Sequence, residues 1–337
     1  MGQEIGILDF IPRDHETNAI EAFQNSTRLL KQADKLGLGR YWYAEHHTTP
    51  SILGSSPLTL VGHGLALTSQ IKIGTGGVML DNISAFQLAE HYKVLDSLAP
   101  GRVDAGVGYS NRKEQDTQEA MGGLIPKQNA NYEEAMQSLS AYMSDYFPPD
   151  FVGPEIHVMP MTEPHHIPLY GLVGSRRNAK FLAENGWDLV FGLFLSPNLE
   201  ECRETIRIYR ENFKPNRTGQ PPRVIVALYV VSSPTYADIP AMERSVDHWI
   251  YAFGTDKRQI FELLPLGDAE HYPLAQAERD IIDRYRDAKV VGRPREIQAQ
   301  LRQLKRELGC DEFMVVNQLP GFYYRSALVD MLSEIKL

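Results

Sequence analysis

The segment Arg40–Pro50 reads Arg-Tyr-Trp-Tyr-Ala-Glu-His-His-Thr-Thr-Pro. Its aromatic first half is typical of a buried strand. That run ends abruptly in three ionisable side chains, Glu45, His46 and His47. Because active sites of parallel α/β barrels lie at the carboxyl ends of the strands, this junction predicts a catalytic rim. The alternative is a strand followed by a solvated polar loop, and the rest of the chain bears on that choice.

Strand and helix patterns alternate along the whole chain. The expected strands are Ile5–Phe10, Arg40–Ala44, Ile71–Met79, Arg102–Val107, Ile167–Leu172, Trp187–Leu193, Arg223–Val231 and Glu312–Asn317. The expected helices are Thr17–Leu36, Pro57–Thr68, Ser84–Leu98, Asn131–Tyr146, Arg176–Asn185, Leu199–Phe213, Pro294–Leu308 and a terminal helix near Ser326–Ile335. This order predicts an α/β fold, a (β/α)8 TIM barrel forming a single domain over residues 1–337.

Two stretches are longer than a barrel needs: Tyr109–Ala130 after the fourth strand and Ser232–Gly292 after the seventh. Loops that follow barrel strands face the active site, so long ones are candidate lids or substrate-binding insertions. We therefore interpret residues 232–292 as an insertion or lid region. The alternative for both stretches is peripheral decoration or a subunit contact.

Composition excludes several classes of protein. The 34 basic and 43 acidic residues give a formal net charge of −9 without a basic block, which argues against nucleic acid and anionic membranes as partners. Cys202 and Cys310 have no metal-ligand spacing and are too few for a disulfide scaffold. Residues 1–9 do not form the apolar core of a signal peptide, and no run approaches the roughly 18 apolar residues of a membrane span. We expect a cytoplasmic protein.

The third expected strand carries Gly74, Gly76 and Gly77. Glycine weakens a strand, so several in one strand need a reason. Close approach of a flat ligand to the backbone is one reason, and a strained peptide or a bulge is another. A bend of the barrel would explain them equally well.

A Gly-Ser-Arg sequence, Gly174, Ser175 and Arg176, stands where the fifth strand meets its helix. The first N–H groups of a helix and the positive end of its dipole favour phosphate. The Ser175 hydroxyl and the Arg176 guanidinium would add donors. The alternative is ordinary N-capping by Ser175.

The order of the motifs resembles the bacterial luciferase-like flavin-dependent monooxygenases. The motifs are Tyr41–His47, Ile73–Leu80, Ala89-Glu90, Leu95-Asp96, Pro100-Gly101-Arg102 and Gly106-Val107-Gly108. The resemblance is strongest from Ile5 to Gly108, continues through Val173–Gly186 and returns in Val291–Asn317.

This resemblance implies an enzyme that uses reduced FMN, delivered by a separate flavin reductase, together with O2. A flavin C4a-hydroperoxide would oxidise an aldehyde or another small organic substrate in a cavity that excludes water. The family's catalytic histidine corresponds to His46 and its neighbouring acid to Glu45. The family suggests a homodimer through the early helices, and light emission is not implied.

The resemblance also assigns the cofactor site. A non-prolyl cis peptide under the flavin ring corresponds to Gly76-Gly77, and the phosphate end to Gly174, Ser175 and Arg176. Many relatives place an arginine, sometimes after a cysteine, just beyond the fourth strand. This chain has Gly108, Tyr109 and then Arg112 there, so Arg112 would reach the phosphate from a shifted loop.

Three alternatives stay open. A metal site would need ligands from His46-His47, His157 and His165-His166, and each adjacent pair can offer one ligand at most, so we expect no metal. A flavin-binding protein without turnover is the second alternative. A deazaflavin (F420)-dependent oxidoreductase on the same barrel is the third, although a deazaflavin's longer polar tail needs more basic residues than this rim offers.

Overall fold

A closed barrel of parallel strands forms the centre of the molecule. The computed structural model describes residues 4–109, 120–121, 131–149, 151–161, 167–217, 219–255 and 262–337. In this part, eight strands follow the order β10-β1-β2-β3-β5-β6-β7-β8, and β8 pairs back onto β10. The barrel strands are β1 (Ile5–Asp9), β2 (Arg40–Tyr43), β3 (Lys72–Thr75), β5 (Val103–Gly108), β6 (Leu169–Val173), β7 (Asp188–Gly192), β8 (Val224–Val231) and β10 (Glu312–Val316). The predicted (β/α)8 TIM barrel is confirmed.

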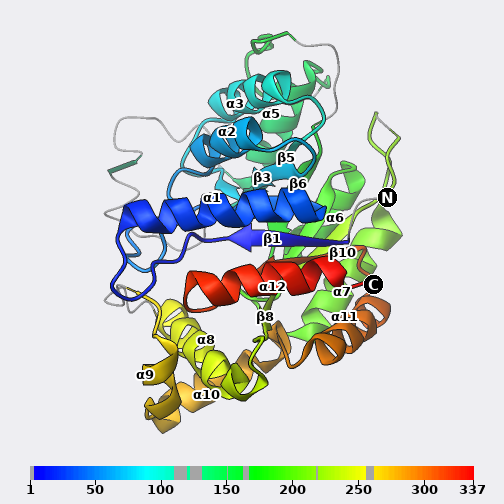
Figure 1. The fold of residues 1–337 in the computed structure, drawn as a ribbon. Helices are drawn as coiled ribbons and strands as arrows, with labels where there is room; N and C mark the ends of the chain where they lie inside the picture. The colour runs from blue at the N-terminus through cyan, green and yellow to red at the C-terminus, as the bar shows by residue number, and fades with distance from the viewer. Residues whose placement is uncertain are drawn as a thin grey trace.

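Helices cover the outside of the barrel. They are α1 (Ala19–Leu36), α2 (Pro57–Leu67), α3 (Ala85–Leu98), α5 (Tyr132–Ser144), α6 (Ala179–Glu184), α7 (Leu199–Asn212), α8 (Ile239–Gly254), α9 (Leu266–His271), α10 (Gln276–Arg284), α11 (Pro294–Leu308) and α12 (Phe322–Glu334). Figure 1 shows α12, α1, α2 and α3 side by side on one face. In the described part of the chain, no helix has the length and hydropathy of a membrane span.

Local sequence signals set the limits of α1. The Asn18 side chain accepts from the N–H of Glu21 (3.1 Å), and the Glu21 carboxylate accepts from the N–H of Asn18 (3.1 Å), which is a capping box. Gly37 ends the helix at φ 77°, a left-handed conformation that glycine adopts without strain. Ala22, Leu29 and Ala33 lie on the buried face of this helix.

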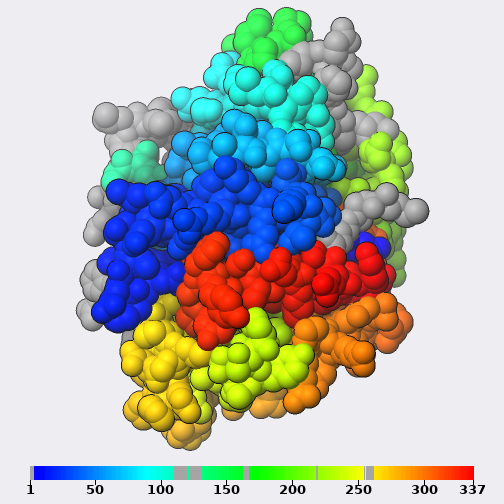
Figure 2. All heavy atoms as spheres, viewed as in Figure 1, coloured from blue at the N-terminus to red at the C-terminus, as the bar shows by residue number. Residues whose placement is uncertain are grey.

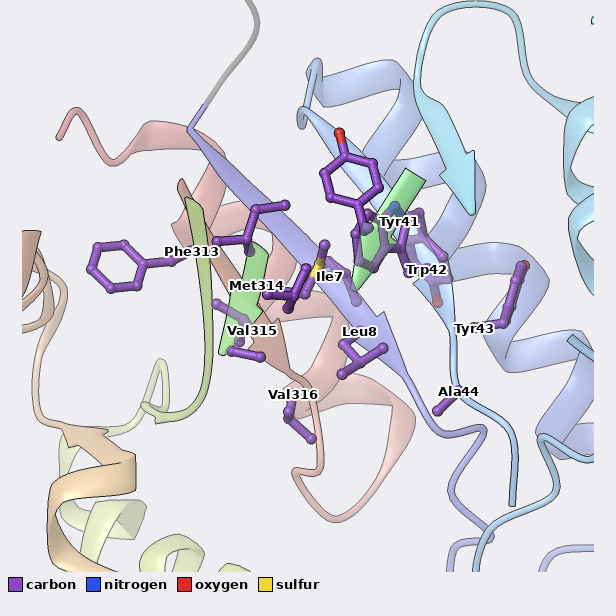
Figure 3. Packing of buried hydrophobic residues seen from close by; sticks show 14 of the residues in the cluster. Ile7, Leu8, Tyr41, Trp42, Tyr43, Ala44, Phe313, Met314, Val315 and Val316 are labelled. Carbon is purple, nitrogen blue, oxygen red and sulfur yellow. The ribbon is translucent and has the colours of Figure 1, made fainter. Parts of the chain in front are cut away.

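Side chains alternate between the inside and the outside of the barrel. On β2, Arg40 contacts residues of other strands across the interior, whereas the Tyr41 hydroxyl donates outward to Asp9 (2.6 Å), which also binds Ser26 of α1. Figure 3 shows the apolar side chains where β10, β1 and β2 lie next to one another. Leu8 of β1 lies between the side chains of the two flanking strands. The interior is therefore filled by side chains and is not a pore.

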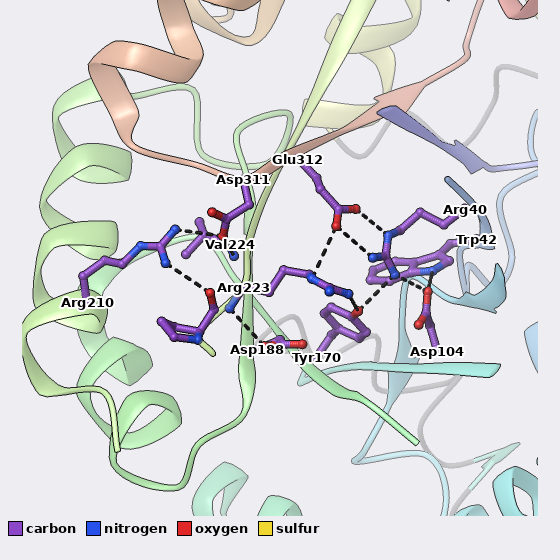
Figure 4. A network of polar contacts seen from close by, with 11 residues as sticks. Arg40, Trp42, Asp104, Tyr170, Asp188, Arg210, Arg223, Val224, Asp311 and Glu312 are labelled. Carbon is purple, nitrogen blue, oxygen red and sulfur yellow. Dashed lines mark hydrogen bonds and ion pairs between the residues drawn. The ribbon is translucent and has the colours of Figure 1, made fainter. Parts of the chain in front are cut away.

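A polar network closes the amino end of the barrel (Figure 4). Arg40 donates to Glu312 (2.6 and 2.9 Å), to Tyr170 (3.0 Å) and to Asp104, all inside the barrel. Arg223 reaches the same Tyr170 hydroxyl (3.1 Å). These buried ions are paired with one another, as burial requires. This network occupies the amino end of the barrel, so a binding site is expected at the opposite, carboxyl end.

The third strand, expected over Ile71–Met79, is interrupted at its glycines. The peptide between Gly76 and Gly77 is cis, and it separates β3 from the short β4 (Val78–Met79), which pairs with β5. A Cβ on Gly77 would lie 2.8 Å from the carbonyl oxygen of Gly106. Close contact with the neighbouring strand therefore accounts for Gly77 directly, and the expected cis peptide is confirmed.

Two further expectations need correction. The helix predicted over Arg176–Asn185 is a 3-10 turn, η1 (Arg176–Asn178), followed by α6. The terminal helix begins earlier, at Phe322 behind Gly321, because its aromatic first turn packs onto the core like the rest of α12. The insertion after β8 contains α8, α9, α10, two 3-10 turns (η2, Tyr236–Asp238; η3, Arg286–Ala288) and β9 (Lys289–Val291), which pairs with the end of β8.

Candidate active site at the carboxyl end of the barrel

The strand ends that the sequence singled out lie at one end of the barrel. In the parallel register, Tyr43 of β2 lies beside Asp9 on one side and Thr75 on the other, and Met79 lies beside Gly108. Glu45, Gly77 and Val173 follow or end strands of the same direction. These strand ends therefore form one rim, and Ser175 lies beyond the same end of β6.

His46 lies among aromatic side chains. Its ring centroid is 4.8 Å from that of Phe10 and 5.4 Å from that of Phe253, and its backbone N–H donates to the carbonyl of Gly54 (2.8 Å). Burial, with a smaller effect of the nearby His47, lowers the pKa of His46 to about 4. The imidazole is therefore neutral near pH 7 and offers one N–H donor and one acceptor nitrogen.

The aromatic cluster around His46 was not found from the sequence. Phe10 of the β1 end contacts Phe194 (5.7 Å between ring centroids) and Trp249 (5.8 Å). Trp249 stacks on Phe253 at 4.8 Å and 14°. Trp249 and Phe253 stand four residues apart on α8, a helical spacing that could have indicated a shared apolar face. The insertion thus contributes aromatic surface beside His46.

Glu45, expected to be the acid beside His46, has other neighbours: its side chain contacts Met79, Asn82 and His47. Its carboxylate accepts from the backbone N–H of Met79 (3.0 Å) and from the amide of Asn82 (2.8 Å). The Nε2 atom of His47 lies 2.9 Å from the same carboxylate. Glu45 therefore fastens the end of β2 to the chain that follows the Gly76-Gly77 cis peptide, and its contacts are those of a positioning residue.

The expected phosphate site is exposed and partly engaged by an acidic side chain. Ser175 is exposed, and its hydroxyl makes no capping hydrogen bond, so the N-capping alternative does not hold. The Arg176 N–H donates to Glu201 (2.8 Å), and its guanidinium pairs with the same carboxylate. A Cβ on Gly174 would lie 3.4 Å from Ser196, so the backbone there approaches that residue closely.

The corner beyond β5 is described only in part. The carbonyl of Gly108 accepts from the N–H of Leu80 (2.9 Å), and the ring of Tyr109 lies 6.1 Å from that of Tyr132. Burial, with a smaller effect of Asp81, raises the pKa of Tyr109. Arg112 lies outside the described residues.

No cluster of three or more histidine, cysteine or acidic side chains suited to a metal occurs among the residues that the structure describes. His165 and His166, named in the metal alternative, lie outside that part of the chain.

A family model described as luciferase-like monooxygenase matches residues 3–312. The chain belongs to this family. A relative from Bacillus subtilis (strain 168), the uncharacterized protein YceB, is 28% identical over 335 residues, which cover 99% of each chain. A luciferase-like monooxygenase of Escherichia coli (strain K12) is 27% identical, over 98% of this chain and 96% of that one. An N-acetyl-S-alkylcysteine monooxygenase of Bacillus subtilis is 30% identical over 64% of each. Membership supports oxidoreductase activity of the monooxygenase type.

Solved structures place this luciferase-like chain among similar barrels. Apo-MsnO8 superposes with a TM-score of 0.87 at 25% identity, over 99% of this chain and 98% of that one. The FMN complex of the oxygenating constituent of 3,6-diketocamphane monooxygenase, from the CAM plasmid of Pseudomonas putida, gives 0.67 at 16% identity over 100% and 99%. An F420-dependent secondary alcohol dehydrogenase gives 0.69 at 15% over 100% and 98%. The last two likenesses concern the fold alone.

Proposed function

We propose that this luciferase-like chain is a monooxygenase that uses reduced FMN and O2 to oxidise a small organic substrate, aldehyde-like in its reactive group. The observation that carries the proposal is His46, a neutral imidazole in contact with Phe10 and Phe253 at the mouth of the barrel, where Trp249 stacks on Phe253. A positioned histidine can transfer protons to or from a bound substrate. Apolar surroundings favour a substrate with an apolar body.

The residues on this rim fit FMN. The Gly76-Gly77 backbone bears no side chain on which a flat ring would clash, and Gly108 lies on the adjacent strand. At the other end, the uncapped hydroxyl of Ser175 and the exposed Arg176 suit a phosphate group, with Gly174 beside them. Reduced FMN bound there would supply the electrons that activate O2. The expected contributions of Tyr109 and Arg112 remain proposals.

The chain's own residues would divide the work around that cofactor. His46 would donate or accept a hydrogen bond at the reacting group. Glu45 would hold the cis-peptide segment in place through Met79. The insertion over residues 232–292 would act as a lid, since α8 brings Trp249 and Phe253 to the site and excludes water there.

We also propose that the enzyme is a cytoplasmic homodimer that receives reduced FMN from a separate flavin reductase. Large apolar side chains are exposed on the helices expected at the dimer contact: Ile20 of α1 is 69% exposed, and Leu98 of α3 is 75% exposed. Figure 2 shows α1, α2 and α3 covering one continuous face. Large exposed apolar side chains on neighbouring helices favour an interaction surface.

One experiment separates this function from its alternatives. The purified chain is supplied with NADH, a flavin reductase, FMN and O2, and alkyl aldehydes and N-acetyl-S-alkylcysteines are tested as substrates. Oxidised product formed in proportion to NADH consumed supports the monooxygenase. Tight FMN binding without any product would favour a non-catalytic flavin-binding protein. Binding and turnover with F420 but not with FMN would favour the deazaflavin enzyme.

A further inference from the structure

Gln318 is a buried side chain whose amide is unpaired within the described ranges of the chain. It is 1% exposed, and neither Oε1 nor Nε2 makes a hydrogen bond to any residue in the described part of the chain. Buried amides are ordinarily paired, and an unpaired one lowers stability. Gln32 of α1, a half-buried amide, is paired with α12, because it donates to Asp330 (2.7 Å) and accepts from Ser326 (2.8 Å).

The position of Gln318 is the mouth of the barrel. Val316, the last residue of β10, pairs with Leu8 of β1, and Gln318 follows just beyond this end of β10, while Phe10 follows the same end of β1. Phe10 is the residue whose ring contacts His46. The side chain of Asn317 turns outward, since its amide donates to the carbonyl of Arg325 on α12 (3.2 Å). The Gln318 N–H donates to the carbonyl of Val316 (3.1 Å), and this tight turn keeps the buried Gln318 side chain at the carboxyl end of β10.

The topology separates Gln318 from the cofactor residues. Around the closed barrel, β10 is four strands from β5 in either direction. Gly77 follows β3 and Ser175 follows β6, so both lie toward the β5 side. Gln318 therefore approaches the site from the opposite wall, together with Phe10.

We propose that Gln318 is the polar anchor of the substrate site and that it binds an amide-type group carried on an apolar substrate body. The carboxamide offers one acceptor, Oε1, and the two hydrogens of Nε2, and a group with one N–H and one C=O satisfies both ends. A site that hydrogen-bonds such a group discriminates against an analogue without it, because the buried amide is then left unpaired. The inference rests on the proposed function for its assignment to the substrate. The imide edge of a flavin has the same donor–acceptor chemistry, so the test includes it.

The test compares Gln318→Leu with the wild type on matched ligands. The probes are N-alkylacetamides and the corresponding alkyl acetates, which differ only in N–H against ester oxygen, and dissociation constants are measured by ligand-observed NMR on the full chain. The wild type should bind each amide about tenfold more tightly than its ester, the scale of one hydrogen bond to a buried group. Gln318→Leu should bind the two within about twofold. An amide preference absent from the wild type, or retained in the variant, overturns the proposal.

Two further measurements separate substrate binding by Gln318 from flavin binding and from pairing inside the protein. FMN affinity is followed by flavin fluorescence. About a tenfold loss of FMN affinity in Gln318→Leu, with the amide preference unchanged, would make the flavin the occupant and overturn the substrate assignment.

Unfolding midpoints without ligand should be equal or higher for Gln318→Leu but lower for the control Gln32→Leu. A midpoint lowered as in the control would mean that Gln318 is satisfied inside the folded protein. If Gln318→Leu loses the amide preference but the wild type oxidises no substrate, the amide site is supported and the monooxygenase function is refuted.

Discussion

At the scale of single residues, the rim of the barrel separates neighbours in the sequence into different roles. Glu45 and His47 contact each other, whereas the intervening His46 contacts Phe10 and Phe253. Strand alternation is the physical reason, because consecutive side chains leave the backbone on opposite sides. The structure thus separates His46 from His47, and it places Glu45 in contact with His47. The catalytic role of His46 stays a prediction.

Replacing His46 by alanine should lower coupled substrate oxidation by about 10²–10⁴-fold, the usual contribution of a positioned acid–base group, and leave FMN affinity nearly unchanged. His47→Ala is the matched control and should cost far less. Because the pKa of His46 is lowered to about 4, the ring gains a proton only as pH falls toward that value. The wild-type rate should therefore show no transition from this residue between about pH 6 and 8. Full coupled turnover in His46→Ala would assign the proton transfer to another group.

Asp188 at the amino end of β7 makes stability depend on pH. Burial raises the pKa of Asp188 to about 7, although the charge of Arg223 acts to lower it. The backbone N–H of Arg223 also donates to this carboxylate (3.1 Å). The pKa of this carboxyl group is about 3.9 in the unfolded chain and higher in the folded protein. Its contribution to stability is therefore complete below about pH 3.9 and is lost as pH rises through about 7. Asp188→Asn keeps the acceptor oxygen and removes the titration.

Urea unfolding at pH 5 and pH 8 checks this expectation. The wild type should lose more stability between the two pH values than Asp188→Asn does, because only the wild type must ionise a buried carboxyl group. Equal losses in the two proteins would mean that Asp188 is already ionised at pH 5.

At the scale of elements, close contact between strands decides where glycine is required. A Cβ on Gly106 of β5 would lie 2.0 Å from the carbonyl oxygen of Thr75 on β3, a backbone atom that cannot move aside. Gly267 of α9 has nothing within 4 Å of the same position. Both residues look alike in the sequence, and only the packing of β3 against β5 distinguishes them.

Gly106→Ala should destabilise the barrel by about 3 kcal/mol or more, the upper range for overpacking. Gly267→Ala should instead raise stability by up to about 1 kcal/mol, because alanine is the better helix former. Denaturant midpoints of the two variants provide the comparison. Similar denaturant midpoints for the two variants would show that β3 and β5 can move apart with little loss of stability.

The strand–helix junction at Ser175 carries the phosphate proposal. Ser175→Ala together with Arg176→Ala should weaken FMN binding by about 1–3 kcal/mol through lost charge-assisted contacts. Glu201→Gln should leave affinity equal or raise it, since Glu201 now holds Arg176 and the pairing lowers the pKa of Glu201. Fluorescence titration with FMN measures both. Unchanged affinity in the double variant would move the phosphate elsewhere, with Arg112 as the next candidate.

At the scale of the whole molecule, the exposed apolar side chains of α1 and α3 bear on assembly. If this face is the dimer contact, Leu98→Glu should convert a dimer to a monomer, because a carboxylate buried in an apolar interface is strongly unfavourable. Val152→Glu is the control, since Val152 is also exposed but lies outside these helices. Light scattering during gel filtration gives the masses, to be compared with 38.1 kDa for one chain. A dimer that persists in Leu98→Glu uses another face.

The sequence by itself determined the barrel, because the alternation of strand and helix patterns depends on local periodicity and on caps such as Asn18 and Gly37. It also located the rim at Glu45–His47 and the cis peptide at Gly76-Gly77, since strand ends and glycine pairs are local features and the family resemblance fixes their order. Tertiary structure alone decided the surroundings of His46. Phe10, Phe194 and Trp249 are far apart in the chain, and only closure of the barrel brings them together. The same holds for Gln318, because only the three-dimensional structure shows that its amide is buried and unpaired among the described residues.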